Sequence, residues 1–243
     1  MSLFVIGDLH LSTLESTNKS MEIFGRRWSG YMEKISKNWK AVVSPDDTVV
    51  IPGDISWALS LEEAESDLKF IDILPGRKIF LKGNHDFWWS TLSKMNSFFE
   101  SKEISSISFL YNNALLVEDF ILCGSRGWYQ DEECDKAKQD KNYEKIVARE
   151  CIRLRLSLEE GKKLKEQFPD KEIIVFMHFP PAWNKFECDE FISILKEYDV
   201  HRCYFGHIHG NYSVPAFFEK EDIDFIIISA DYLDFVPRLI LPN

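Results

Sequence analysis

Short apolar runs alternate with amphipathic segments along most of the chain. In the first third, the apolar runs at 3–6, 48–51 and 78–81 are typical of buried strands. Apolar residues at helical spacing lie between them and predict helices over 31–43 and 61–73. The expected order is strand, helix, strand, helix, strand, which indicates parallel strands joined by right-handed crossovers.

The pattern changes after a third helix, which is predicted at 91–99. Short β-like runs then follow at 107–110, 114–117 and 120–123, with polar turn residues between them. Such spacing is typical of hairpins, so we expect a second and more antiparallel half to begin here. The turn residues are Asn112, Asn113, Glu118 and Asp119.

Residues 131–168 are highly charged, and most of this charge is expected on a solvated face. An amphipathic helix is predicted over 143–168, although its apolar residues do not share one stripe, which allows a break within it. Strand-like runs follow at 173–177 and 203–205, with a helix predicted at 190–198 between them. Two further strand-like runs close the chain at 225–229 and 239–241. Packing the two halves together would bury the inner faces of both sheets.

The chain has 243 residues, 45% of them hydrophobic and 28% charged, which fits one large domain over residues 1–243. Its formal net charge of −11 argues against extended binding to nucleic acid, because the phosphate backbone requires a basic surface. A small phosphate ester held by metal ions remains compatible with this charge. Bound divalent cations would offset part of it.

The five cysteines form no CxxC pair, and their number is odd. Reduced thiols in a cytoplasmic protein are the simplest interpretation. The first apolar run is too short for a signal peptide, and none approaches the roughly 18 apolar residues of a membrane span. We therefore expect no membrane association. The cysteines are Cys123, Cys134, Cys151, Cys188 and Cys203.

Five of the apolar runs end in polar residues suited to metal binding or proton transfer. Parallel strands place their carboxyl ends at one edge of a sheet, which is where α/β proteins carry their chemistry. A single histidine is most often a core or surface residue, but five of the six histidines in this chain occupy such positions. The strand-end residues are Asp8, His10, Asp54, Asn84, His85, His178, His207 and His209.

A mixture of imidazole and carboxylate ligands favours Mn, Fe, Zn or Co over Mg or Ca, which prefer oxygen ligands alone. The set holds more ligands than one ion needs. Two divalent transition-metal ions roughly 3.5–4 Å apart and bridged by a carboxylate would account for the excess. A single ion with the remaining histidines in supporting positions is the alternative.

The motifs, taken in order, resemble those of the calcineurin-like metallophosphoesterases, and they span residues 7–210. The resemblance implies a four-layer α/β/β/α sandwich, in which helices flank two mixed sheets. It also implies hydrolysis of a phosphoester by in-line attack of a metal-bridging water or hydroxide on phosphorus. The matching blocks are Asp8-x-His10, Gly53-Asp54, Gly83-Asn84-His85-Asp86, His178 and Gly206-His207-x-His209.

The resemblance also implies a role for each residue of these motifs. His85 would face the substrate and protonate the leaving oxygen, and Asp86 would orient His85. Asp54 would bridge the two ions. The first ion would bind Asp8, His10, Asp54 and His209, and the second would bind Asp54, Asn84, His178 and His207.

One departure from the family concerns phosphate binding. Protein phosphatases of this superfamily carry an arginine shortly after the Gly-Asp motif, whereas residues 53–58 contain no cation, so a phosphoprotein substrate is less expected. Arg126, in the glycine-flanked loop at 124–128, is the best substitute and is predicted to bind the substrate. The alternative for Arg126 is a surface arginine paired with an acid such as Asp131.

A small phosphoester is the expected substrate, and the sequence does not choose among nucleotides, sugar phosphates, lipid head groups and the less expected phosphoproteins. A binding scaffold with little catalysis is the alternative function. Such scaffolds lack the catalytic histidine or some ligands, and this chain keeps them all. A metallo-β-lactamase-type hydrolase would need a His-x-His-x-Asp-His cluster, which is absent. Tryptophans near the motifs could stack on a substrate or pack in the core: Trp57, Trp88, Trp89, Trp128 and Trp183.

Overall fold

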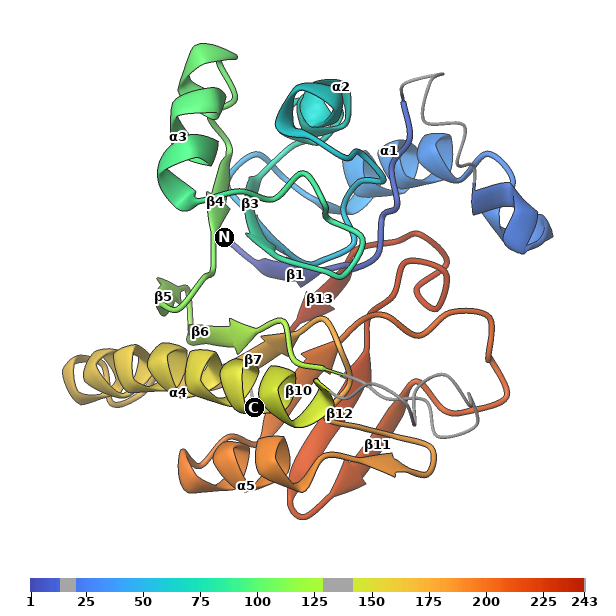
Figure 1. Ribbon diagram of the computed structural model, residues 1–243. Coiled ribbons are helices and arrows are strands. Elements are labelled where there is room, and N and C mark those ends of the chain that lie inside the picture. The colour runs from blue at the N-terminus through green and yellow to red at the C-terminus, as the bar shows by residue number, and fades with distance from the viewer. Residues whose placement is uncertain (14–20, 129–141, 243) are drawn as a thin grey trace.

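The computed structural model describes residues 1–13, 21–128 and 142–242. Within these residues a five-stranded sheet and a six-stranded sheet lie face to face. Three helices cover the outer side of the first sheet and two cover the outer side of the second (Figure 1). The four-layer α/β/β/α sandwich implied by the resemblance is therefore confirmed.

The first sheet is built around the three strands predicted in the first third of the chain. These strands and a short fourth one pair in parallel, and a fifth strand adds antiparallel at the other edge. In sheet order they are β13 (Arg238–Ile240), β1 (Leu3–Val5), β2 (Thr48–Pro52), β3 (Arg77–Leu81) and β4 (Ile107–Phe109). The helices that connect β1 to β4 in turn are α1 (Tyr31–Val42), α2 (Leu61–Asp72) and α3 (Leu92–Ser101). The predicted alternation of strands and helices is confirmed.

The second sheet has a parallel centre and antiparallel edges. In sheet order its strands are β11 (Phe217–Lys220), β12 (Ile223–Ile227), β10 (Arg202–Phe205), β7 (Glu172–Met177), β6 (Phe120–Ser125) and β5 (Leu115–Val117). Only the two edge pairs, β11 with β12 and β5 with β6, are antiparallel among the described strands of this sheet. The second half is therefore more antiparallel than the first, as expected, with two antiparallel pairs of five against one of four, but its centre is parallel. The connections are helical instead: α4 (Tyr143–Gln167) joins β6 to β7, and α5 (Asp189–Glu197) follows a small hairpin of β8 (Ala182–Trp183) and β9 (Phe186–Glu187).

The prediction of a hairpin at Asn112 and Asn113 was wrong, because β4 and β5 belong to different sheets. Strand β4 pairs in parallel with β3, so Lys78 lies opposite Ile107. Asn112 adopts a left-handed backbone (φ 57°), and the Asn113 side chain accepts a hydrogen bond from the chain two residues before it. These residues do reverse the chain, but the reversal carries it from one sheet to the other. A turn motif does not specify which strand will be the partner.

Helix α4 runs for 25 residues without a break. Its buried face includes Glu150, Ser157 and Gly161, which a search for apolar residues in the sequence does not detect. Together with Val147 and Leu154 these residues recur every three or four positions, which is one face of a helix. Small and polar residues therefore complete the stripe that apolar residues alone leave irregular.

The space between the sheets is filled by side chains that alternate along each strand. In β1, Leu3 and Val5 pack into the layer between the sheets, whereas Phe4 points outward to the helices α1 to α3. Residues of the second sheet, including Phe176 and Tyr204, complete the inner layer. Because one face of each strand meets the other sheet, both sheets keep a fixed relative position.

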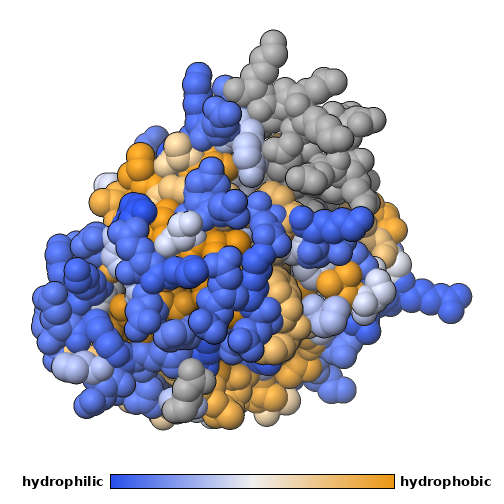
Figure 2. All heavy atoms as spheres, turned by 90° about the horizontal axis from the view of Figure 1, so that it is seen from below, coloured by the Kyte–Doolittle hydropathy of each residue, from blue (hydrophilic) through white to orange (hydrophobic). Residues whose placement is uncertain are grey.

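The outer surface of the second half is mainly polar. Figure 2 views the molecule from the side where α5 and β11 lie in Figure 1, and it shows hydrophilic residues over most of this face with smaller hydrophobic patches between them. In the described parts of the chain, no helix combines the length and the apolar character that crossing a membrane requires. In the described part of the charged segment, most charged side chains of α4 are exposed or partly exposed, as expected for a solvated face.

Helix α4 approaches β6 very closely at Ser157 and Gly161. The Ser157 hydroxyl accepts a hydrogen bond from Gly124 N at 2.9 Å and donates one to the Asn113 carbonyl at 2.6 Å. A Cβ on Gly161 would overlap the sulfur of Cys123 on β6. This sulfur is fully buried, so it has little room to move.

We expect Gly161→Ala to destabilise the protein, although alanine is the better helix former. The added methyl should overpack the contact with Cys123, at roughly 1–3 kcal/mol, which exceeds the gain of about 1 kcal/mol from helix propensity. Denaturant unfolding of the single variants and of Gly161→Ala combined with Cys123→Ala measures this. In the double variant the added methyl should no longer destabilise. An equal effect of Gly161→Ala in both backgrounds would contradict the contact.

Candidate metal centre and active site

The polar strand ends of both sheets meet at one edge because the two sheets are joined there. Beyond β1, Gly7 N donates a hydrogen bond to the Ile228 carbonyl at 2.7 Å, and Ala230 N donates one to the Gly7 carbonyl at 3.0 Å. Gly7 thus extends the first sheet onto residues that follow β12 of the second. The loops after β1, β2 and β3 consequently lie beside those after β7 and β10.

Four of the predicted ligands adopt a left-handed backbone. The φ angles are 56° at Asp8, 46° at His10, 50° at Asp54 and 69° at His207. Such conformations are unfavourable for residues other than glycine and occur preferentially at functional sites. The strain bends each loop sharply at the strand end, so that the side chains turn toward the shared edge.

Two glycines of the motifs allow the loops to approach the carboxylates. A Cβ on Gly83 would overlap the backbone nitrogen and a carboxylate oxygen of Asp54, and a Cβ on Gly206 would overlap the carboxylate of Asp8. Both positions therefore require the absence of a side chain. The glycines are part of the site because they set how closely the loops pack.

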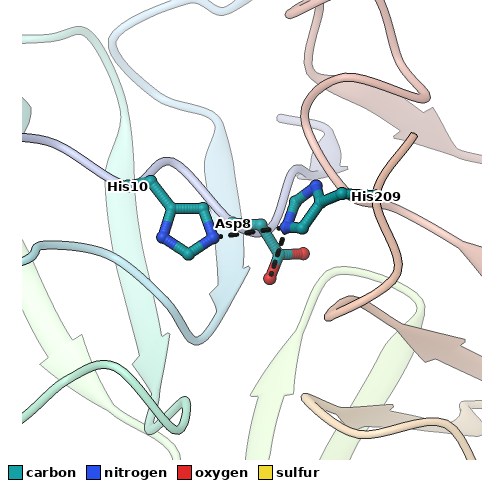
Figure 3. Close-up of side chains that lie close together, drawn as sticks. All are labelled: Asp8, His10 and His209. Atoms are coloured by element: carbon teal, nitrogen blue, oxygen red, sulfur yellow. Dashed lines mark hydrogen bonds and ion pairs between the residues drawn. The ribbon is translucent and has the colours of Figure 1, made fainter. Parts of the chain in front are cut away.

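The first group of potential ligands consists of Asp8, His10 and His209, whose side chains point toward one another (Figure 3). His10 Nε2 and His209 Nε2 are 3.2 Å apart, and His209 Nε2 is 3.7 Å from an oxygen of Asp8. One ligand atom from each residue lies within 4.8 Å of the others. Two imidazole nitrogens and a carboxylate oxygen therefore converge on one point.

A second group consists of Asp54, His178 and His207. His178 Nε2 is 3.5 Å from an oxygen of Asp54. The side-chain oxygen of Asn84 joins this group, at 2.6 Å from His178 Nε2 and 3.1 Å from His207 Nδ1. All seven residues predicted as metal ligands are thus found in or beside one of the two groups.

Asp54 lies between the two groups. Its Oδ2 is 3.6 Å from His10 Nε2 in the first group, and its Oδ1 is 3.5 Å from His178 Nε2 in the second. One carboxylate therefore presents one oxygen to each side, as a bridging ligand must. The same Oδ1 accepts a hydrogen bond from His85 N at 2.8 Å, which also fixes the next loop.

The electrostatics of this edge fit a cation. Burial, reinforced by repulsion from neighbouring histidines, lowers the pKa of His10 and lowers that of His207 to about 3, so these imidazoles are neutral and offer lone pairs. Burial and then the charges of Asp86 and Asp8 raise the pKa of Asp54. Buried carboxylates this close together are unfavourable unless a positive charge lies between them. Neutral imidazoles mixed with carboxylates are a donor set for divalent transition metals.

His209 differs from the other histidines because Asp231 holds it. Its Nδ1 is 2.8 Å from the Asp231 carboxylate, which also accepts hydrogen bonds from Gly210 N and the Tyr212 hydroxyl. Burial lowers the pKa of His209, but the hydrogen bonds with Asp231 and Asp8 outweigh it and raise the pKa to about 10. A carboxylate behind a ligating histidine fixes the ring so that the other nitrogen faces the metal. The sequence analysis did not single out Asp231, although it also follows a predicted strand.

Asp86 is fully buried and anchors the loops that carry Asp54 and Asn84. Its two oxygens accept hydrogen bonds from Gly83 N, Asp54 N, Ile55 N, Ser56 N and Trp88 Nε1, at 2.8 to 3.3 Å. It therefore ties the loop after β2 to the loop after β3. Its orientation of His85 stays a prediction.

His85 lies beside the first group and against an indole. Its ring centre is 5.7 Å from that of His10 and 4.3 Å from that of Trp57. Trp57 in turn stacks on His10 at 4.8 Å. Trp28, in the short 3-10 helix η3 (Arg26–Trp28), packs edge-on against His209 at 5.5 Å. Aromatic rings therefore enclose the first group.

The other tryptophans near the motifs serve mainly in packing. Trp88, Trp89 and Trp183 are buried in the hydrophobic cores, and the Trp88 indole donates its hydrogen bond to Asp86. Trp128 is partly buried and lies under the guanidinium of Arg126, whose carbon is 5.2 Å from the ring centre. For the three buried indoles, core packing rather than substrate stacking is what the structure supports.

Arg126 is mostly buried, with 17% of its side chain exposed. Its Nη2 is 3.5 Å from the carboxylate of Glu150, a fully buried residue on α4. The alternative of a surface arginine is wrong, because the Arg126 side chain is mostly buried. Its expected partner Asp131 lies outside the described residues. The Arg126 carbonyl accepts a hydrogen bond from Phe179 N at 2.9 Å, which places this loop next to His178.

The fold and the site together define an α/β sandwich protein with two groups of potential metal ligands that share a carboxylate. The family profile described as calcineurin-like phosphoesterase matches residues 1–211, and the chain belongs to this family. No protein with a curated description matches the sequence significantly.

Several solved structures share the fold. A protein of unknown function, AQ665 from Aquifex aeolicus, aligns with a TM-score of 0.53 at 17% identity and covers 98% of this chain and 95% of its own. Phosphopantetheinyl hydrolase (PptH) from Mycobacterium tuberculosis aligns with a TM-score of 0.55 at 14% identity and covers 100% of this chain and 96% of its own. TT1561 from Thermus thermophilus aligns with a TM-score of 0.53 at 8% identity and covers 95% of this chain and 89% of its own. At these identities the likeness concerns the fold alone.

We expect Asp86→Asn to lower the free energy of unfolding by about 3 kcal/mol or more, because an amide leaves at least two buried N–H donors without an acceptor, at roughly 1–3 kcal/mol each. Denaturant unfolding measures the loss. Asp47→Asn is the matched control, since Asp47 is also buried but accepts hydrogen bonds from two backbone groups of the described residues, Ser2 N and Ser44 N. The control should lose clearly less stability. Equal losses would mean that Asp86 does not anchor the loops.

Proposed function

We propose that the protein hydrolyses small phosphoesters with two divalent transition-metal ions, Mn, Fe, Zn or Co. The observation that carries this is the position of Asp54, which presents one oxygen to each of two groups of potential ligands. His85 stands directly beside them. Metal-dependent phosphoester hydrolysis is the activity that membership of the family suggests.

Each proposed ion has its own set of ligands. Asp8, His10, Asp54 and His209 would hold the first, and Asp54, Asn84, His178 and His207 the second. Bound in this way, a pair of ions lowers the pKa of a water molecule toward neutrality and neutralises charge on the phosphoryl oxygens. Asp231 would keep the His209 ring aligned toward the first ion.

The remaining steps fall to side chains of the chain itself. We propose that the His85 imidazole donates a proton to the leaving oxygen as its bond to phosphorus breaks. The Trp57 ring beside it would limit access of water to that proton. Arg126 would bind phosphoryl oxygens, because its loop lies next to His178. Its positive charge also interacts electrostatically with His178 and Asp54.

A binding scaffold without catalysis is the second candidate. It would not need His85, the strained backbone at the ligands or the second group. Since the chain retains all three, hydrolysis is the better supported function. The formal charge of −11 also supports a small substrate over an extended nucleic acid.

The direct test is an assay of the purified protein against phosphomonoesters, phosphodiesters and nucleotides, each with Mn, Fe, Zn, Co and Mg. Hydrolysis that depends on a transition metal and is lost with a chelator would support the proposal. No turnover with any ester and any metal would favour the scaffold. The panel also distinguishes monoester from diester preference.

We expect close to two Mn ions per chain after reconstitution and removal of free metal. Asp54→Asn should weaken both sites, because one carboxylate serves both, whereas His10→Ala should weaken mainly the first. Metal analysis and calorimetric titration measure the stoichiometry. His201→Ala is the matched control, since His201 is exposed and lies 3.2 Å from Asp199, outside both groups of potential ligands. This variant should bind as many Mn ions as the wild type does. One ion per chain with full activity would rule out the two-ion proposal.

We expect His85→Ala to keep both ions and the fold but to lower kcat by roughly 10²–10⁴, the usual effect of removing a positioned proton donor. The loss should be smaller for nitrophenyl esters, whose leaving group is stable without a proton. Steady-state kinetics with alkyl and nitrophenyl esters, alongside metal analysis, measure both. A uniform loss would assign His85 to binding of the phosphoryl oxygens, and loss of metal would show that His85 is a ligand.

A further inference from the structure

A cluster of positive side chains lies next to the second group of potential ligands. We define the cationic cluster as Lys82, Arg126, Arg149 and Arg153. Lys82 follows β3 and directly precedes the Gly83–Asn84 motif, Arg126 follows β6, and the other two lie on α4. The cluster therefore borders the same edge as the candidate metal centre, on the side of His178.

The cationic cluster is not neutralised by its own acid. Three arginines share a single oxygen of Glu150: Arg153 Nη1 at 2.8 Å, Arg149 Nε at 3.4 Å and Arg126 Nη2 at 3.5 Å. The second oxygen of Glu150 is buried and has no hydrogen-bond partner among the described residues. Among the described residues Glu150 is the acid in ion-pair contact with all three arginines, so these positive charges outnumber the acid they share. Such crowding is repulsive unless an anion joins it.

The cationic cluster also has an unused donor and a space beside it. Arg126 Nε is buried and makes no hydrogen bond with the described residues. A small cavity of about 20 Å³ is lined by Lys82, Arg126, Glu150 and Arg153, with Tyr111 and Asn112 at its side. An ion-pair network that served packing alone would match its charges and donors. This one combines excess positive charge and an unpaired donor beside a cavity with room for about one water molecule, so an anionic group would bind at its mouth and not inside it.

We propose that the cationic cluster is a subsite for a second anionic group of the substrate, so that the substrate is a phosphoester that also carries a further phosphoryl or carboxylate group. This inference rests on the proposed function. Arg126 connects the two sites, because its backbone bonds to Phe179 beside His178 and its guanidinium is 3.5 Å from Glu150. The scissile phosphoryl group would meet Arg126 at the metal centre, and the second group would meet Arg153, Arg149 and Lys82.

The substrate test compares three related esters with the Mn-loaded protein: glycerol 3-phosphate, 3-phosphoglycerate and 2,3-bisphosphoglycerate. The wild type should show a KM lower by about tenfold or more for the two esters with a further anionic group, since each charge-assisted hydrogen bond contributes at this level. The difference should shrink as the salt concentration rises. A preference for 2,3-bisphosphoglycerate over 3-phosphoglycerate would identify the second group as phosphoryl, and similar KM values for these two, which share the carboxylate, would identify it as carboxylate.

Two variants and a matched control assign the effect to the cationic cluster. Arg153→Gln and Arg149→Gln should each reduce the KM advantage of the esters with a further anionic group, by about tenfold for the more buried Arg153. Arg155→Gln removes a charge two positions further along α4, where Arg155 pairs with Glu197 at 2.6 Å, and should keep the advantage. Thermal unfolding checks each variant, and the half-exposed Arg149 provides a folded variant if Arg153→Gln does not fold.

Binding without turnover separates the two proposals. Calorimetry with methylphosphonate and phosphonoacetate, which differ by one carboxylate and are not hydrolysed, should show an affinity difference that falls in Arg153→Gln. That result together with no hydrolysis of any ester would overturn the proposed function and leave the subsite standing. Hydrolysis with equal KM for all three esters, or an equal loss for all three in Arg153→Gln, would overturn the subsite and leave the function standing.

Discussion

The whole arrangement depends on the backbone hydrogen bonds of Gly7, which join two sheets whose other described contacts involve side chains. Gly7 continues β1 and bonds to residues on both sides of Ser229, beyond the end of β12. A side chain there would displace the end of the Ile228 side chain, because a Cβ would lie 2.6 Å from its terminal carbon. This contact aligns the carboxyl edges of the sheets, and five loops from opposite ends of the sequence can then face one another.

The edge so formed is unfavourable as a protein structure in isolation. Several residues predicted as ligands have a left-handed backbone, and buried carboxylates and imidazoles lie in contact with one another. The surrounding structure offsets this with hydrogen bonds directed at the loop backbones. Asp86 binds the loops after β2 and β3, and Asp67 on α2 binds Ser56 and Thr13 in the loops after β2 and β1. The strain is thus held locally by buried carboxylates of the neighbouring elements.

The sequence was most informative where a buried strand ends in a motif. The strands before Asp8, Asp54 and Asn84 and the helices between them were predicted because apolar periodicity there has one explanation. The partner of β4 could not be predicted, since pairing depends on which sheet edge is free. Helix α4 was predicted, but whether it is continuous was left open because Ser157 and Gly161 pack without being apolar. The seven residues predicted as ligands do come together, but their roles depend on metals and stay predictions. Asp231 and Glu150 were missed because a buried acid looks like a surface acid in a sequence.

The pairing of β1 with β13 has a consequence for the time course of folding. Leu3 lies opposite Ile240, so the first sheet is finished by a strand that follows every element of the second. Closing so long a loop loses entropy before any contact compensates for it, and such pairings form late. Until then one side of β1 carries unpaired backbone groups, which other chains can bind. We therefore expect that the protein is most prone to aggregation in the interval between formation of the parallel core and arrival of β13, and that the speed of this last step sets how much of it reaches the native state.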